Sequence, residues 1–125
     1  MDTTHAPDPR RIVVIGPCGS GKTTLSHRLR ALGFDAHACG QEHSEIPELW
    51  AHQEPEVLVG LRIDLKTLRR RRSASWSDRL YAKQLERLRS GYDHADLVID
   101  ADVNDEDAVL DAVLSWLRDH EESGL

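Results

Sequence analysis

The sequence of 125 residues has few cysteines, few aromatic residues and no long apolar run. Its two cysteines, Cys18 and Cys39, are too few for a disulfide framework and favour a reducing, cytoplasmic setting. No apolar stretch approaches the roughly 20 residues that cross a membrane, so we expect neither a membrane span nor a secretory leader. Aromatic residues make up only 5% of the chain, so an aliphatic core is expected.

Positive charge is also scarce overall, but it is unevenly distributed. The formal net charge of −6 argues against general nucleic-acid binding. Residues 62–89 nevertheless hold ten of the sixteen lysines and arginines and only three acids, whereas residues 93–125 hold eleven acids and one base. A basic middle on an otherwise acidic chain fits a local site for a polyanion.

One motif dominates what the sequence does contain. Residues 16–23 read G-P-C-G-S-G-K-T, between an apolar run at residues 12–15 and a helical pattern that follows. This is the G-x-x-x-x-G-K-[ST] phosphate-binding loop, or P-loop, in its strand-to-helix context. Glycines let the backbone wrap closely around phosphate oxygens, and the start of the helix adds free N–H donors. The expected nucleotide-binding residues are Gly16, Pro17, Cys18, Gly19, Ser20, Gly21, Lys22, Thr23 and Thr24, with Lys22 on the β- and γ-phosphates and Thr23 on Mg²⁺.

Apolar periodicity predicts strands that alternate with helices. The expected strands are residues 11–15, 34–39, 57–63 and 96–100, and the expected helices are residues 21–32, 65–71, 76–90 and 105–118. Gly33 and Gly91 are expected to end the first and third helices, with Leu32 and Leu80 on their apolar faces. This order, together with the P-loop motif, predicts an α/β, three-layer P-loop NTPase domain with a mostly parallel sheet, spanning residues 11–120 after a flexible tail at residues 1–10.

The arginine-rich segment admits two interpretations. Residues 69–72 are four consecutive arginines, and Arg79 follows beyond a break at residues 73–75. Charge runs are usually solvated faces. In a chain with a P-loop, however, an arginine such as Arg70, Arg72 or Arg79 could reach over the triphosphate and neutralise charge on the transferring oxygens.

Together these features resemble the nucleotide kinase-like group of P-loop NTPases, of which adenylate and shikimate kinases are members. The resemblance rests on the P-loop, on the strand that leads from Val57 to Asp64 and into the arginine-rich helices, and on the strand that ends at residues 100–102. It implies that residues 65–91 form a lid-like segment over ATP. It also implies that residues 100–104, including Asp102, lie beside the adenine.

The chain departs from that group in two respects. Residues 40–56 are too short for an acceptor-binding domain, and no second apolar strand ends in the acid that usually supports Mg²⁺. Glu42 is the first candidate for that acid, because it follows the predicted strand at residues 34–39. Asp64 is the second, with a helix-capping role as its alternative.

The function that we expect from the sequence is a Mg²⁺-dependent, ATP-binding phosphotransferase acting on a small-molecule acceptor. Lys22, Glu42 and one of the arginines would carry the catalysis, and Thr23 with Glu42 or Asp64 would bind the metal. The lack of an N-K-x-D motif favours ATP over GTP. The alternatives are a simple NTPase and a regulatory nucleotide-binding module with little turnover, which would act through a protein partner or a homo-oligomer.

Overall fold

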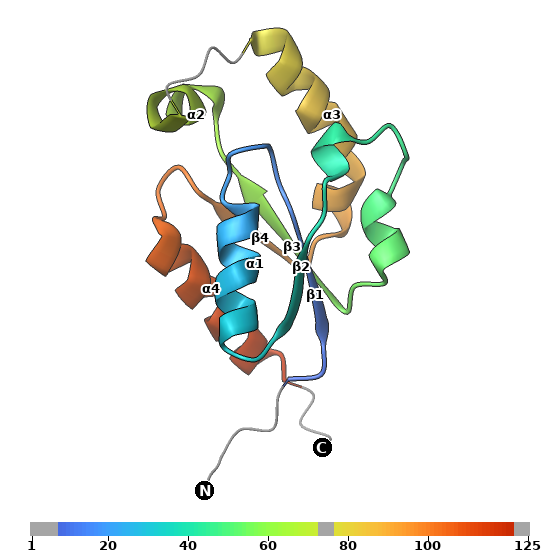
Figure 1. Cartoon of the computed structure of the whole chain (residues 1–125), viewed down its shortest axis with the longest axis vertical. Helices are drawn as coiled ribbons and strands as arrows, with labels where there is room; N and C mark the ends of the chain where they lie inside the picture. The colour runs from blue at the N-terminus through green and yellow to red at the C-terminus, as the bar shows by residue number, and fades with distance from the viewer. Residues whose placement is uncertain (1–7, 73–76, 122–125) are drawn as a thin grey trace, which may run out of the picture.

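A four-stranded parallel sheet forms the centre of the fold. The computed structural model describes residues 8–72 and 77–121 (Figure 1). The strands lie in the order β2-β1-β3-β4, so the strand that precedes the P-loop motif is flanked on both sides. They are β1 (Arg11–Ile15), β2 (Asp35–Ala38), β3 (Val57–Arg62) and β4 (Leu97–Asp100). An α/β fold with a parallel sheet is therefore confirmed.

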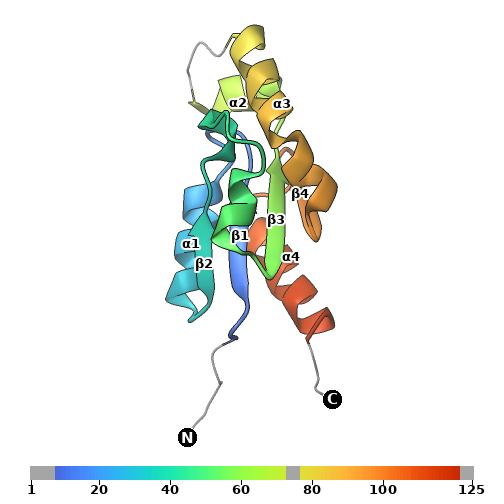
Figure 2. The ribbon, with the colours of Figure 1, turned by 90° about the vertical axis from the view of Figure 1, so that its right-hand side faces the viewer.

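Helices cover both faces of this sheet (Figure 2). The α-helices are α1 (Lys22–Ala31), α2 (Leu65–Arg72), α3 (Asp78–His94) and α4 (Glu106–Asp119), and two 3₁₀ turns, η1 (Gln41–His43) and η2 (Leu49–Gln53), connect β2 to β3. Helices α1 and α4 pack on one face through Leu25, Leu29 and Val113. Helix α3 and η2 pack on the other through Leu88 and Trp50. Among the described residues, no helix is long and apolar enough to cross a membrane.

The carboxyl ends of β1 and β3 lie at a topological switch point of the sheet. The chain leaves β1 toward β2 on one side, whereas it leaves β3 toward β4 on the other. In open α/β sheets the crevice at such a point is the usual ligand site. The loop that follows β1 lies at this edge.

The third helix differs from the sequence prediction. Helix α3 continues through Gly91 to His94 instead of ending at Gly91, because Gly91 lets the helix approach the sheet. A Cβ at Gly91 would collide with the side chain of Ile15. The predicted start of this helix at Trp76 lies outside the described residues, and helix α3 begins at Asp78 with Ser77 as its cap. Gly33, by contrast, follows α1 with a φ of 98° and closes that helix as predicted.

Two leucines expected on the apolar helix faces are exposed. Leu32 is 56% exposed and Leu80 is 43% exposed. Leu32 is the residue after the last turn of α1, and Leu80 lies in the first turn of α3. Each lies near a helix end, and the buried positions Leu29 and Leu88 carry the contacts with the sheet instead.

Leu88 is the residue that we expect to hold α3 on the sheet. Its side chain is fully buried against Val13, Ile15 and Leu58. Leu88→Ala is expected to lower the free energy of unfolding by about 2–5 kcal/mol, because it removes buried apolar contacts and leaves a cavity. Urea denaturation followed by circular dichroism measures this loss. A change below about 0.5 kcal/mol would show that α3 does not depend on this contact.

Candidate phosphate-binding site

The loop at residues 16–21 is a tight turn that only glycine fits at its first position. A Cβ at Gly16 would lie 2.6 Å from Ser20 Oγ and 2.9 Å from the carbonyl oxygen of Leu61. The Ser20 N–H donates to the Pro17 carbonyl at 3.0 Å and closes the turn. Gly21 then adopts a φ of 103°, which side chains rarely tolerate, and passes the chain into α1. The loop therefore follows a closely defined path beside β3.

The first turn of α1 offers N–H donors that no side chain caps. Gly21 is the N-cap residue and has no side chain to accept from them, and the first turn holds no acidic residue. The first N–H groups of any helix also lack partners within the helix. Lys22, Thr23 and Thr24 occupy this turn. The backbone and the helix dipole thus present partial positive charge to the space above the loop.

A buried ion pair lies across that space. Lys22 Nζ is 2.6 Å from Glu42 Oε2 and 3.4 Å from the Pro17 carbonyl oxygen. The two charged side chains are 10% and 4% exposed, respectively. Glu42 belongs to η1, directly after β2, so the strand order brings it to the P-loop. Glu42 Oε1 is buried and has no hydrogen-bond partner within the described part of the chain, so it remains an available acceptor.

Thr23 and Glu42 line the same cavity, whose volume is ≈ 380 Å³. This is within the range of small-ligand sites. The N-terminal turn of α1 forms one wall, and residues 38–40 with Glu42 form the other. The lining residues are Cys18, Gly19, Gly21, Lys22, Thr23, Thr24, Ala38, Cys39, Gly40 and Glu42. The structure therefore brings most of the predicted binding residues together. Burial raises the pKa of Cys39, which keeps that thiol neutral.

Two residues of α3 reach this region, and neither was predicted from the sequence. Gln84 is 1% exposed, and its Oε1 accepts from the Cys18 N–H at 3.0 Å. Arg87 donates from Nη1 to the Glu42 carbonyl oxygen at 3.2 Å and pairs with Glu45 at 3.4 Å. They lie three positions apart on one helix face, which is a spacing that could have singled them out as an inward polar pair.

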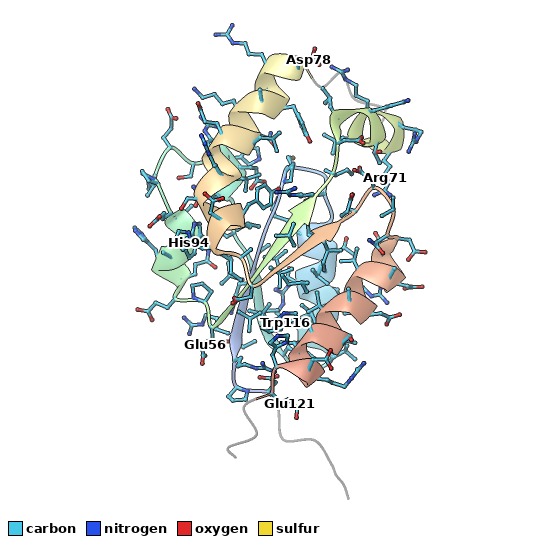
Figure 3. All side chains as sticks on the ribbon, turned by 180° about the vertical axis from the view of Figure 1, so that it is seen from behind. Glu56, Arg71, Asp78, His94, Trp116 and Glu121 are labelled. Atoms are coloured by element: carbon cyan, nitrogen blue, oxygen red, sulfur yellow. The ribbon has the colours of Figure 1, made fainter. Side chains whose placement is uncertain are left out.

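The predicted arginines lie elsewhere. Arg70 and Arg79 are exposed, and the side chain of Arg72 lies outside the described residues. Arg69 pairs with Asp78 at 3.0 Å. Arg71 reaches the loop after β4, where its Nη2 donates to the Ala101 carbonyl at 2.8 Å (Figure 3).

Arg71 also lines a small cavity of ≈ 60 Å³ beside the P-loop. Ser20, Gly21 and Thr24 contribute to it from the loop and α1, and Ala101 and Asn104 contribute from the segment after β4. The loop after β4 therefore lies next to the start of α1.

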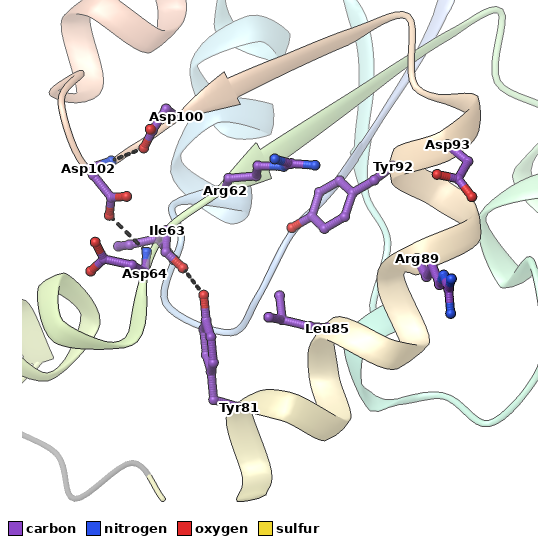
Figure 4. Close-up of a pocket in the computed structure, with 10 residues that line it drawn as sticks. All are labelled: Arg62, Ile63, Asp64, Tyr81, Leu85, Arg89, Tyr92, Asp93, Asp100 and Asp102. Carbon is purple, nitrogen blue, oxygen red and sulfur yellow. Dashed lines mark hydrogen bonds between the residues drawn. The ribbon is translucent and has the colours of Figure 1, made fainter. Parts of the chain in front are cut away.

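Asp64 and Asp102 line a third cavity, of ≈ 500 Å³, under α3 (Figure 4). Asp64 Oδ1 caps α2 by accepting from the Thr67 N–H at 2.7 Å, and this bond lowers the pKa of Asp64. Asp102 Oδ1 accepts from the Asp64 N–H at 2.8 Å, and its pKa is raised chiefly by burial. Neither residue lines the cavity of Thr23 and Glu42, so the capping role of Asp64 is the one that its contacts support.

The described residues contain no cluster of three or more His, Cys, Asp or Glu side chains that could hold a metal ion unaided. Comparison with models of known protein families and with curated proteins finds no match for this chain. The residues of the site must therefore carry any argument about function.

Proposed function

We propose that this protein is a Mg²⁺-dependent, ATP-binding phosphotransferase of the P-loop nucleotide kinase-like group, acting in the cytoplasm. The observation that carries the proposal is the buried Lys22–Glu42 pair, 2.6 Å apart, facing the uncapped N-terminus of α1. Burial of a charged pair is costly unless the two charges are well hydrogen-bonded or serve the function of the protein. A lysine and an acid at the end of a phosphate-binding loop are the groups that phosphoryl transfer requires.

In this proposal the triphosphate lies along the loop and the start of α1. The backbone N–H groups of Gly19 and of residues 21–24 bind the phosphate oxygens, and Lys22 exchanges its bond with Glu42 for the β- and γ-phosphates. The adenine side of the nucleotide extends toward the small cavity that Asn104 shares with Thr24. Asp102 lies in a different cavity, so Asn104 replaces it in our assignment.

The residues also suit a magnesium ion that shares its ligands with the phosphates. Mg²⁺ is commonly held by one or two protein oxygens together with phosphates and water. Thr23 is an exposed residue that supplies a hydroxyl, and Glu42 Oε1 is an acceptor with no partner in the described chain. The ion, when bound, would neutralise charge on the transferring oxygens. Glu42 would orient its water ligands or accept the proton of the acceptor hydroxyl.

A regulatory nucleotide-binding module is the second candidate function. The connection between β2 and β3 is the feature that favours it. This connection contains only the two 3₁₀ turns η1 and η2, which leaves little surface for an acceptor. In that case nucleotide binding would alter contact with a protein partner or a second copy, with little turnover.

ADP release separates the two functions. Wild-type protein with Mg²⁺ and ATP is assayed against a panel of small hydroxylated and phosphorylated acceptors, with Lys22→Ala as the control. The proposal predicts that at least one acceptor raises ADP production well above the control. ADP production that no acceptor raises would contradict the phosphotransferase proposal, whether or not it exceeds that of Lys22→Ala.

A further inference from the structure

The cavity of ≈ 500 Å³ under α3 takes no part in the proposed function (Figure 4). It lies where β3 and β4 end, and Tyr81, Leu85 and Tyr92 of α3 form one of its walls. The Tyr81 hydroxyl donates to the Ile63 carbonyl, and the Tyr92 hydroxyl donates to the Leu61 carbonyl at 2.7 Å. Because these bonds fix both rings, the wall is already formed, and the volume is that of a small-ligand site.

Arg62 and Asp100 line this cavity from neighbouring strands without forming an ion pair. The two residues are partners in the register of β3 and β4. The Arg62 guanidinium instead lies 5.1 Å from the centre of the Tyr92 ring, directed away from Asp100 (Figure 4). Within the described part of the chain it has no hydrogen bond or ion pair. Its N–H donors are therefore available to an anionic group.

Carboxylates gather at the opposite end of the cavity, after β4. Asp100 Oδ1 accepts from the Asp102 N–H at 2.9 Å, and Asp102 Oδ1 accepts from the Asp64 N–H at 2.8 Å. None of these three carboxylates forms an ion pair with another described residue. Burial, with a contribution from Asp100, raises the pKa of Asp102, which means that its charged form is disfavoured there. A cation beside these carboxylates would relieve that cost.

The balance of charge limits the class of ligand. The charged groups that line the cavity are four carboxylates and two guanidinium groups, from Asp64, Asp93, Asp100, Asp102, Arg62 and Arg89. A dianion such as phosphate would add negative charge to a lining that is already acidic, so it is disfavoured. A carboxylate carries one charge and matches the fork of a guanidinium. An ammonium group matches the acidic end.

We infer that the cavity under α3 binds a small zwitterion. Its ammonium group lies beside Asp100 and Asp102, its carboxylate accepts from Arg62, and a short carbon chain between them packs against Tyr81 and Leu85. This site is separate from the proposed function, since it requires no nucleotide in the P-loop.

The test is a nuclear magnetic resonance titration of the isotope-labelled full chain with zwitterions of increasing length. The probes are β-alanine, γ-aminobutyrate, δ-aminovalerate and ε-aminocaproate, and n-butylamine and butyrate carry one charge each. Arg62→Gln removes the guanidinium, and Asp100→Asn removes a charge but keeps an oxygen for the Asp102 N–H. Arg118→Gln and Asp111→Asn make the same charge changes at exposed positions on α4, which packs on the other face of the sheet. Circular dichroism confirms that each variant folds.

At least one zwitterion is expected to bind roughly 10-fold or more tightly than n-butylamine and butyrate. Arg62→Gln and Asp100→Asn should each weaken that zwitterion by about 10- to 100-fold, which is the effect of losing a hydrogen bond to a charged group. The two α4 variants should bind it as the wild type does. The inference is overturned if no zwitterion binds, if a singly charged probe binds as tightly, or if either cavity variant keeps full affinity. A failure of nucleotide binding would overturn the proposed function and leave this site in place.

Discussion

Lys22→Ala is expected to weaken Mg–ATP binding by two orders of magnitude or more, which corresponds to roughly 3 kcal/mol. The reason is that Lys22 is the charged donor at the end of the loop, 2.6 Å from Glu42 and close to the expected terminal phosphates. Charge-assisted bonds to phosphate are about twice as strong as neutral ones. Calorimetric titration with ATP measures the loss, and Lys83→Ala, an exposed lysine on α3, is the matched control.

The same substitution should also destabilise the protein. Without Lys22, the Glu42 carboxylate, which is 4% exposed, loses the cation that lies 2.6 Å away, and breaking a buried pair from one side costs about 3–5 kcal/mol. The double variant Lys22→Ala/Glu42→Gln should recover much of that stability but none of the ATP affinity. Full ATP affinity in either folded variant would contradict a phosphate-binding role for Lys22.

Mg²⁺ is expected to strengthen ATP binding by a factor about 10- to 100-fold smaller in Glu42→Gln than in the wild type. Turnover should fall by a similar factor. This range is typical when a residue that supports metal ligands is replaced. The substitution keeps the shape of the side chain but removes the charge that Oε1 and Oε2 share. Titrations at increasing Mg²⁺ concentration measure the effect. Glu86→Gln removes an exposed carboxylate on α3 and is the charge-matched control.

The outcome for Glu42 can be separated from a loss of fold. The amide oxygen that Glu42→Gln introduces can still accept from Lys22, so binding of ATP without Mg²⁺ should persist. An unchanged response to Mg²⁺ in a folded Glu42→Gln protein would remove Glu42 from the metal site. Thr23 would then be the remaining predicted metal ligand in that cavity.

The central elements of the fold could be predicted because their sequence signals are local. The apolar run of β1, the glycines of the loop and the leucines of α1 each specify a short segment, and the structure places β1 and α1 close to where they were expected. Element ends were less predictable. The prediction that α3 ends at Gly91 was wrong, because a glycine inside a helix also serves close packing, here against Ile15.

The site was predictable where residues are adjacent in sequence and less so where the topology assembles them. Glu42 could be proposed because it follows a strand end, and the strand order brings it to Lys22. Gln84 and Arg87 were missed because they stand in a basic, polar helix whose inward face is not evident from apolar periodicity alone. The arginine run at residues 69–72 suggested a phosphate contact by its charge, whereas Arg71 bonds instead to the loop after β4.

Whether this protein binds a nucleoside triphosphate is measured by calorimetric titration of the wild type with ATP and GTP, with and without Mg²⁺. We expect saturable binding of ATP that Mg²⁺ strengthens, with weaker binding of GTP. Folded wild-type protein that binds neither nucleotide under either condition would contradict it. The Lys22–Glu42 pair would then be a structural feature of the loop and not a phosphate site.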